Sequence, residues 1–180
     1  MLPDPLHPAI VHFPVALAII FPLMAVLALI FIKRGSSAIN TWIPIAVLAV
    51  MVFAGTLVAK NTGGAEEDKV EEVVSRDAIH DHEENAELFA ILAGITLAIS
   101  LGGFLPNKWG NMARYLTVAA SLAVVFVAYQ TGKSGGELVY EHGAGSAYAT
   151  PSLGNGAEST VSDSTSTSAT SDDDDDDDND

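Results

Sequence analysis

The stretch HPAIVHFPVALAIIFPLMAVLALIFI, residues 7–32, decides the fold of this chain. Its apolar part runs from Ala9 to Ile32 and is interrupted only by His12, Pro14 and Pro22. A helix of about 20 apolar residues crosses the roughly 30 Å hydrocarbon core of a membrane, so this run predicts a membrane span. Counting back from its last residue places His12 near one edge of that core.

The mouth of this span carries candidate ligands. An imidazole in an apolar setting tends to stay neutral, and a neutral imidazole is what haem iron, copper and zinc bind. His12 is therefore a candidate ligand. The alternative is that it caps the carbonyl of Ile10, which Pro14 frees by its missing N–H. His7 is a further candidate, unless it only precedes the helix and bonds to Asp4.

Three more apolar runs complete a membrane domain. The four predicted spans are residues 9–32, 42–59, 88–105 and 112–129. Trp42 is expected at the membrane interface. Gly94, Ala98 and Gly102 repeat every four residues and predict close helix contact along one face. The fold class is thus an all-α polytopic membrane protein.

The connecting segments are polar. Residues 61–87 are acidic, and we expect a turn at residues 61–64 followed by a separate extramembrane helix that runs into the third span. The glycines of TGKSGG, residues 131–136, should turn the chain back and bring His142 near the helix mouths. The transmembrane domain covers residues 1–146, and the Ser/Thr/Asp tail, residues 147–180, has too few apolar residues to order itself.

Composition excludes several function classes. The formal net charge is −15, but residues 151–180 hold ten of the 23 acids and none of the eight bases, which leaves eight bases against 13 acids in the first 150 residues. No basic stripe exists for nucleic acid. The chain has no cysteine, which excludes disulfides, iron–sulfur clusters and covalent haem attachment. No Ser/His/Asp order, HExxH motif or paired-carboxylate spacing indicates a hydrolase, and no transferase motif is present.

Charge also predicts orientation. The loops after the first and third spans carry Lys33, Arg34 and Lys108 without any acid. By the positive-inside rule both loops face the cytoplasm of a bacterial inner membrane, so both termini lie on the outer side. All five histidines then gather on that outer face, although they come from three separate parts of the sequence.

The acidic segment supplies more candidates. His80 and His82 lie two residues apart, so on a helix they point about 200° away from each other and cannot share one metal ion. His80 could share a face with Glu83, Glu84 or Glu87, although a solvated acidic helix is the plainer interpretation. The candidate cofactor ligands are His7, His12, His82 and His142; for a metal ion the candidates are His12, His80, His82, Glu83 and His142.

Four motifs resemble a bacterial membrane family catalogued as domain of unknown function 2231. They are HPAIVHFP at residues 7–14, Thr62-Gly63, His82-Glu83, and GGELVYEHGAG at residues 135–145. The resemblance covers residues 5–146 and implies four spans; some members look fused or adjacent to redox domains, which implies haem or electron-transfer chemistry. The positions it marks are His7, His12, Pro14, His82, Glu83, Gly135, Gly136, Tyr140, His142 and Gly143. This chain departs from the pattern at Lys133, where many relatives have His, so a haem ligand at that position is not expected here.

Two function hypotheses follow. In the first, His12 with His82 or His142 binds a b-type haem or a single transition-metal ion, which makes the protein a redox or metal-handling component of the bilayer with a membrane-bound or periplasmic redox partner. In the second, the protein is a cofactor-free structural or transport-associated membrane subunit. The residues do not determine a substrate or an oligomeric state.

Overall fold

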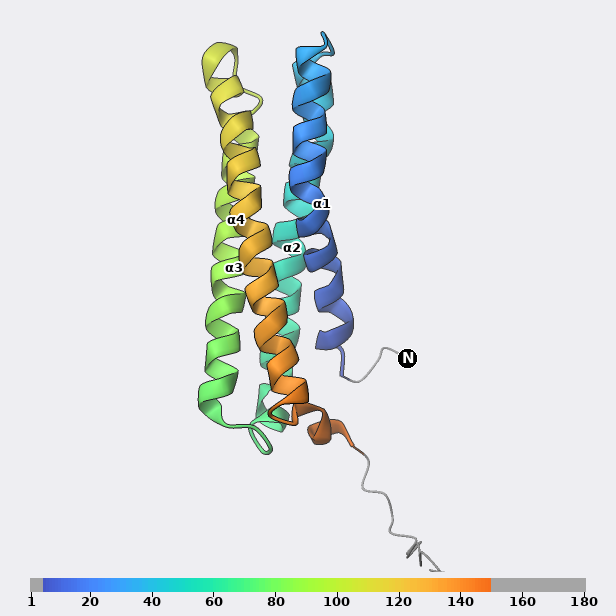
Figure 1. Cartoon of the computed structure of the whole chain (residues 1–180), viewed down its shortest axis with the longest axis vertical. Helices are drawn as coiled ribbons and strands as arrows, with labels where there is room; N and C mark the ends of the chain where they lie inside the picture. The colour runs from blue at the N-terminus through green and yellow to red at the C-terminus, as the bar shows by residue number, and fades with distance from the viewer. Residues whose placement is uncertain (1–4, 150–180) are drawn as a thin grey trace, which may run out of the picture. The chain divides into compact units, whose positions relative to one another are not determined.

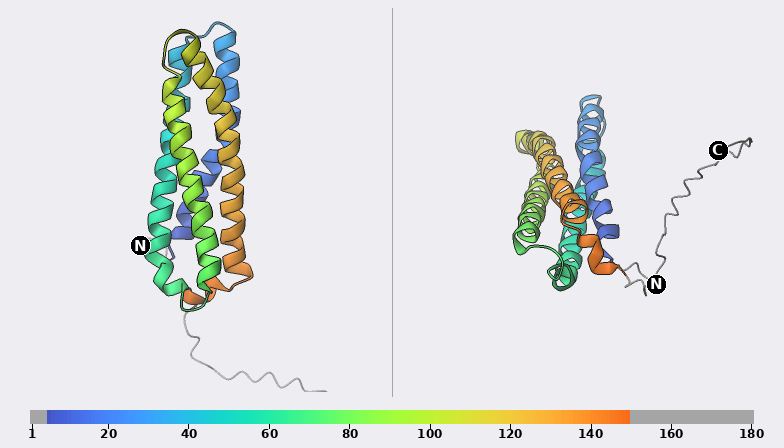
Figure 2. Two further views of the ribbon diagram at one scale, coloured as in Figure 1. Left: turned by 90° about the vertical axis from the view of Figure 1, so that its left-hand side faces the viewer. Right: turned by 60° about the horizontal axis from the view of Figure 1, so that its bottom comes forward.

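Four long helices form an antiparallel bundle in residues 5–149, which are the residues that this computed structural model describes. The elements are α1 (His7–Lys33), α2 (Ala38–Val70), α3 (Arg76–Gly102), α4 (Asn107–Tyr140) and the short 3₁₀ helix η1 (Ala144–Tyr148). Each helix packs on the next and α4 returns to α1, so α1 and α3 face each other across the bundle (Figures 1 and 2). All four are long and apolar enough to cross a membrane, which confirms the predicted fold class.

The two ends of the bundle differ chemically. The basic end holds the loops at residues 34–37 and 103–106, flanked by Lys33, Arg34 and Lys108. The histidine end holds the start of α1, the turn at residues 71–75 between α2 and α3, and the end of α4 (Figure 1). The five histidines lie toward this second end, as predicted. The tail from residue 150 onward falls outside the described residues.

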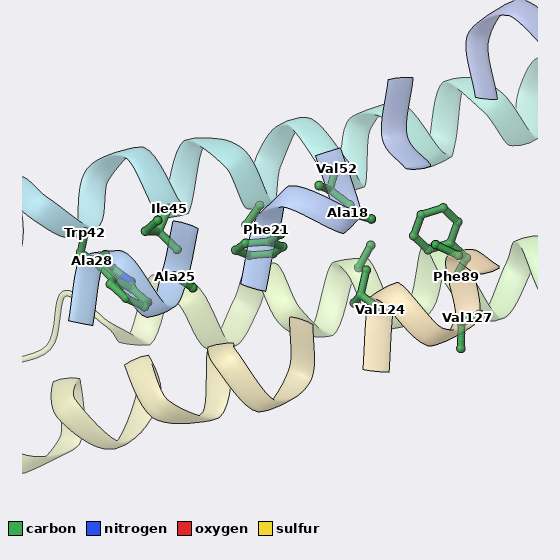
Figure 3. Packing of buried hydrophobic residues seen from close by; sticks show 13 residues of the cluster. Ala18, Phe21, Ala25, Ala28, Trp42, Ile45, Val52, Phe89, Val124 and Val127 are labelled. Atoms are coloured by element: carbon green, nitrogen blue, oxygen red, sulfur yellow. The ribbon is translucent and has the colours of Figure 1, made fainter. Parts of the chain in front are cut away.

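Two hydrophobic clusters stabilise the bundle. The larger one lies along the apolar lengths of the helices and includes Phe21, Trp42 and Phe89 (Figure 3). A smaller one caps the histidine end and is built from Val74, Ile79, Leu138 and Ala144. Between the two, α3 carries the half-buried His82 and Asn85, and α4 carries the half-buried Thr131 and Ser134, so polar side chains separate the two apolar clusters.

Two predicted chain reversals are wrong. α2 runs without interruption through residues 61–64, so the acidic segment is shared between the end of α2 and the start of α3 and forms no separate helix. α4 likewise runs through the glycines of residues 131–136 to Tyr140, whose side chain is 88% exposed. Leu138 is buried in the smaller cluster, whereas His142 follows the helix end and is exposed.

Small residues let the helices approach closely, but not along one face. A Cβ added to Gly94 would lie 3.0 Å from the ring of Phe53 on α2, and one added to Gly102 would lie 3.2 Å from Ala113 on α4. Ala98 is exposed between them. Gly94 and Gly102 therefore serve contacts with different helices. In the first half of α1, Pro14 packs against Gly55 of α2. A Cβ added to Gly55 would lie 3.1 Å from Cβ of Pro14.

Trp42 is fully buried among the helices near the start of α2. Its Nε1 donates to the carbonyl oxygen of Ser100 at 2.9 Å, and the ring lies against Gly103 where a Cβ would collide with Nε1. The carbonyl of Gly103 accepts from Arg114, whose guanidinium lies 5.9 Å from the centre of the Trp42 ring. The indole therefore links α2, α3 and α4 at the basic end.

Gly103→Ala should destabilise the fold by about 1–3 kcal/mol, because the added methyl group overpacks a buried indole. The matched control is Gly132→Ala on α4, where an added Cβ meets nothing within 4 Å. That exchange should be neutral or stabilising by about 0.5–1 kcal/mol, since alanine favours helix. Thermal unfolding of both variants in detergent measures the difference, and equal unfolding temperatures would contradict the Trp42 packing.

Candidate functional site

His7 is the first residue of α1, and α2 holds its ring. Its Nδ1 lies 2.8 Å from the carbonyl oxygen of Ala59 and 3.3 Å from Oγ1 of Thr62. The Thr62 hydroxyl already donates to the same carbonyl at 2.9 Å. A carbonyl can only accept, so Nδ1 of His7 carries a hydrogen. In the neutral ring Nε2 therefore keeps its lone pair.

His82 repeats this arrangement between α3 and α4. Its Nδ1 lies 2.9 Å from Oγ of Ser134. That hydroxyl donates its hydrogen to the carbonyl of Thr131 at 3.1 Å, so it accepts from His82. The neutral ring is again the Nδ1–H tautomer, and its Nε2 is free to accept or to ligate.

The two imidazoles meet across the inside of the bundle. Their ring centroids lie 6.2 Å apart with an interplanar angle of 79°, although α1 and α3 are diagonal in the ring of helices. Both rings are half-buried. Within residues 5–149 neither Nε2 has a hydrogen-bond partner. The bundle thus presents two free imidazole nitrogens from opposite helices.

Each ring lies on a glycine of a Gly-Gly pair. A Cβ added to Gly63 would lie 3.1 Å from Cε1 of His7, and one added to Gly135 would lie 3.1 Å from Cε1 of His82. The second glycine of each pair, Gly64 or Gly136, faces open space. The first glycine of each pair makes room for an imidazole, which explains why glycines occur within uninterrupted helices.

Glu66 of α2 lies beside His7 without being available as a ligand. Its Oε1 accepts from the backbone N–H of Leu6 at 2.6 Å and of His7 at 3.0 Å. Its Oε2 accepts from the Tyr148 hydroxyl of η1 at 3.1 Å. Both carboxylate oxygens are thus engaged by protein donors.

Burial favours a neutral His82. This residue precedes the apolar stretch of α3 that begins at Leu88, so it lies outside the third span predicted from the sequence, residues 88–105. Its pKa is lowered from the ordinary value of 6.5, first by desolvation and then by the neighbouring His7. A lowered pKa keeps the imidazole neutral, which is the form that binds a metal.

The lowered pKa of His82 makes stability depend on pH. In the unfolded chain His82 takes up a proton as the pH falls below 6.5, whereas in the folded chain it stays neutral until the pH reaches its lower pKa. The free energy of unfolding therefore decreases as the pH falls between these two pKa values. The apparent unfolding temperature in detergent should therefore be lower at about pH 5.5 than at about pH 7.5. His82→Gln cannot titrate and should show a smaller difference; an equal difference in both proteins would contradict this.

The structure places the other candidates apart from this pair. His12 is exposed, and its Nδ1 lies 2.6 Å from the carbonyl oxygen of Pro8, so the ring caps a carbonyl one turn earlier, and not that of Ile10. His80 is exposed and pairs with Glu84 at 3.3 Å. Two further candidates, Glu83 and His142, are exposed as well.

The predicted five-residue metal set is not gathered in one place. In the described part of the chain no three His, Cys, Asp or Glu residues lie close enough to hold an ion together. The structure groups His82 with His7, where the sequence had suggested His12 or His142. A metal held by this pair would have two protein ligands.

The sequence did not indicate the supporting residues Glu66 and Ser134, and it marked Thr62 only as part of a family motif. Thr62 and Ser134 orient the rings, and the first glycines of the two Gly-Gly pairs make space for them. The two Gly-Gly pairs were the available signal, because glycine repeated inside a helix has a cost that close packing explains. Glu66 gave no signal among so many neighbouring acids.

Comparison with known proteins adds the family. A family model with the description "Predicted membrane protein (DUF2231)" matches residues 3–148. No curated protein matches the chain. No solved structure matches it.

Proposed function

We propose that this chain, which belongs to the predicted membrane protein family DUF2231, holds a transition-metal centre between His7 and His82 at one end of its bundle of four apolar helices. The centre is either a haem iron or a single metal ion. Either one makes the protein a redox or metal-handling component of the bilayer.

The observation that supports this proposal most is the pair of free Nε2 atoms. A metal-ligating histidine nearly always donates its other ring N–H to a carbonyl, carboxylate or other acceptor, which fixes the tautomer and the ring orientation. His7 does so to Ala59 and His82 does so to Ser134. The two rings come from opposite helices, as in bundles that bind cofactors inside.

The ligand set fits two kinds of centre. Two imidazoles hold a haem iron without any cysteine, because the porphyrin supplies the remaining nitrogens. With a bare ion, two protein nitrogens would leave positions open for water or another ligand. A bound iron or copper supplies one-electron transfer, and the protein contributes a half-buried setting between two apolar clusters.

The proposed orientation puts this site outside the cytoplasm. Lys33, Arg34 and Lys108 flank loops without acids at the basic end, so the positive-inside rule directs that end to the cytoplasm. A redox partner would then be membrane-bound or periplasmic. Labelling of Ser36→Cys only from the cytoplasmic side and of Lys69→Cys only from the outer side would support this orientation; the reverse pattern would overturn it.

The test of the function uses the full chain, purified in detergent after growth with a haem precursor. A reduced-minus-oxidised spectrum detects haem, and metal analysis followed by titration with copper, zinc and iron detects a bare ion. We expect a haem signal or about one equivalent of bound metal. A flat spectrum with no bound metal in folded protein would instead favour a cofactor-free structural or transport-associated subunit.

A further inference from the structure

The first turn of α1 has no cap within its own segment. Its N-cap residue, Leu6, makes no side-chain cap, and Pro8 has no N–H at all. The first N–H groups of a helix have no acceptor inside the helix and need one from elsewhere. Here the donors in question are the N–H groups of Leu6 and His7.

Glu66 provides that acceptor from a different helix. Oε1 of its carboxylate accepts a hydrogen bond from the N–H of Leu6 at 2.6 Å and from the N–H of His7 at 3.0 Å. These two donors lie about 60 residues earlier in the chain. Hydrogen bonds to a carboxylate are among the stronger ones, and an acid at a helix N-terminus is further favoured by the helix dipole. The side chain is half-buried, so water is a poor substitute.

The same carboxylate also reaches η1. Its second oxygen accepts from Tyr148, whose ring lies 5.4 Å from the ammonium group of Lys69. One side chain of α2 therefore ties the start of α1 to the C-terminal 3₁₀ helix.

We propose that Glu66 is a positioning residue: it fixes the first turn of α1 and thereby holds the His7 imidazole in place to ligate. His7 begins the helix, so its ring stays in place only if that turn is formed. Ala59 holds the ring through Nδ1, and Glu66 holds the backbone that carries it. Without the carboxylate two donors lose their acceptor, the turn frays, and His7 swings away from His82.

The first test measures His7 directly and needs no metal. Diethyl pyrocarbonate acylates neutral imidazoles, and peptide mass spectrometry gives a rate for each histidine; His12, exposed on the same helix, is the internal reference. Glu66→Ala should raise the rate at His7 about fivefold relative to His12, because local fraying exposes the ring. Glu66→Gln should restore the wild-type rate, since its amide oxygen still accepts from both N–H groups. Asp68→Ala removes an exposed acid two residues away and should change nothing.

The second test rests on the proposed metal function. Glu66→Ala should weaken metal or haem binding by about tenfold, as loss of a supporting contact usually does, with recovery in Glu66→Gln. A wild-type rate at His7 in Glu66→Ala would overturn the positioning role even if metal binds. If the wild-type protein binds no metal, the proposed metal function is wrong. The acylation rates at His7 then decide alone whether Glu66 positions this ring. If Glu66→Ala does not fold, Glu66→Asp replaces it in both tests. Its carboxylate is one methylene group further from α1, so the rate at His7 should again rise and metal binding should again weaken.

Discussion

His7→Ala and His82→Ala should each weaken metal or haem binding by at least about 100-fold, because removing a direct ligand exceeds the 10- to 100-fold cost of losing a supporting residue. Each substitution removes one of the two imidazoles, whose ring centroids lie 6.2 Å apart. Titration of the purified variants, or the intensity of their haem spectrum, measures the loss. Circular dichroism confirms that the helices are retained.

The exposed histidines are the matched controls for this prediction. His12→Ala and His142→Ala should leave binding within about twofold, since both residues are exposed and the His12 ring is bound to the carbonyl oxygen of Pro8. A large loss in His12→Ala with none in His7→Ala would reverse the assignment. The site would then be the one that the sequence alone suggested.

Gly63→Ala and Gly135→Ala should each weaken binding by about tenfold without unfolding the protein. In both cases the new methyl group would lie 3.1 Å from a histidine Cε1, so the ring must shift by a few tenths of an ångström. Such a shift strains the Nδ1 hydrogen bond and changes the position of Nε2 relative to the other imidazole. The measurement is the same titration, together with thermal unfolding.

The neighbouring glycines test whether position, and not helix propensity, causes this effect. Gly64→Ala and Gly136→Ala add a methyl group into open space. They should keep full binding and gain about 0.5–1 kcal/mol of stability, because alanine is the better helix former. Equal losses in all four variants would mean that the glycines act through the backbone, contrary to the packing described above.

The membrane fold could be predicted from the sequence because burial in lipid imposes a simple rule. Long apolar runs and charged turns were enough to identify four helices. The helix lengths could not be predicted, since glycine and polar residues at 61–64 and 131–136 look like turns when they are read locally. Packing overrides that local preference, because the glycines at 63 and 135 let imidazoles lie against the helix.

The candidate site was predictable in part. His7 and His82 were both candidates, because an imidazole at an apolar boundary is a potential ligand and both belong to family motifs. Their contact depends on the diagonal placement of α1 and α3 and on the register between them, which no local pattern encodes. Glu66 is one acid among many in residues 61–87, and its hydrogen bonds to the start of α1 and to Tyr148 distinguish it.

Nitrogen-15 NMR of the histidine side chains tests the central claim most directly, since it reports the tautomer and the ligation of each ring in the intact protein. Single His→Ala variants assign the five imidazoles. The account predicts that His7 and His82 are Nδ1–H tautomers and that their two Nε2 signals, and no others, shift or broaden when metal or haem is added. Shifts confined to His12 or His142, or no shift at any imidazole, would contradict it.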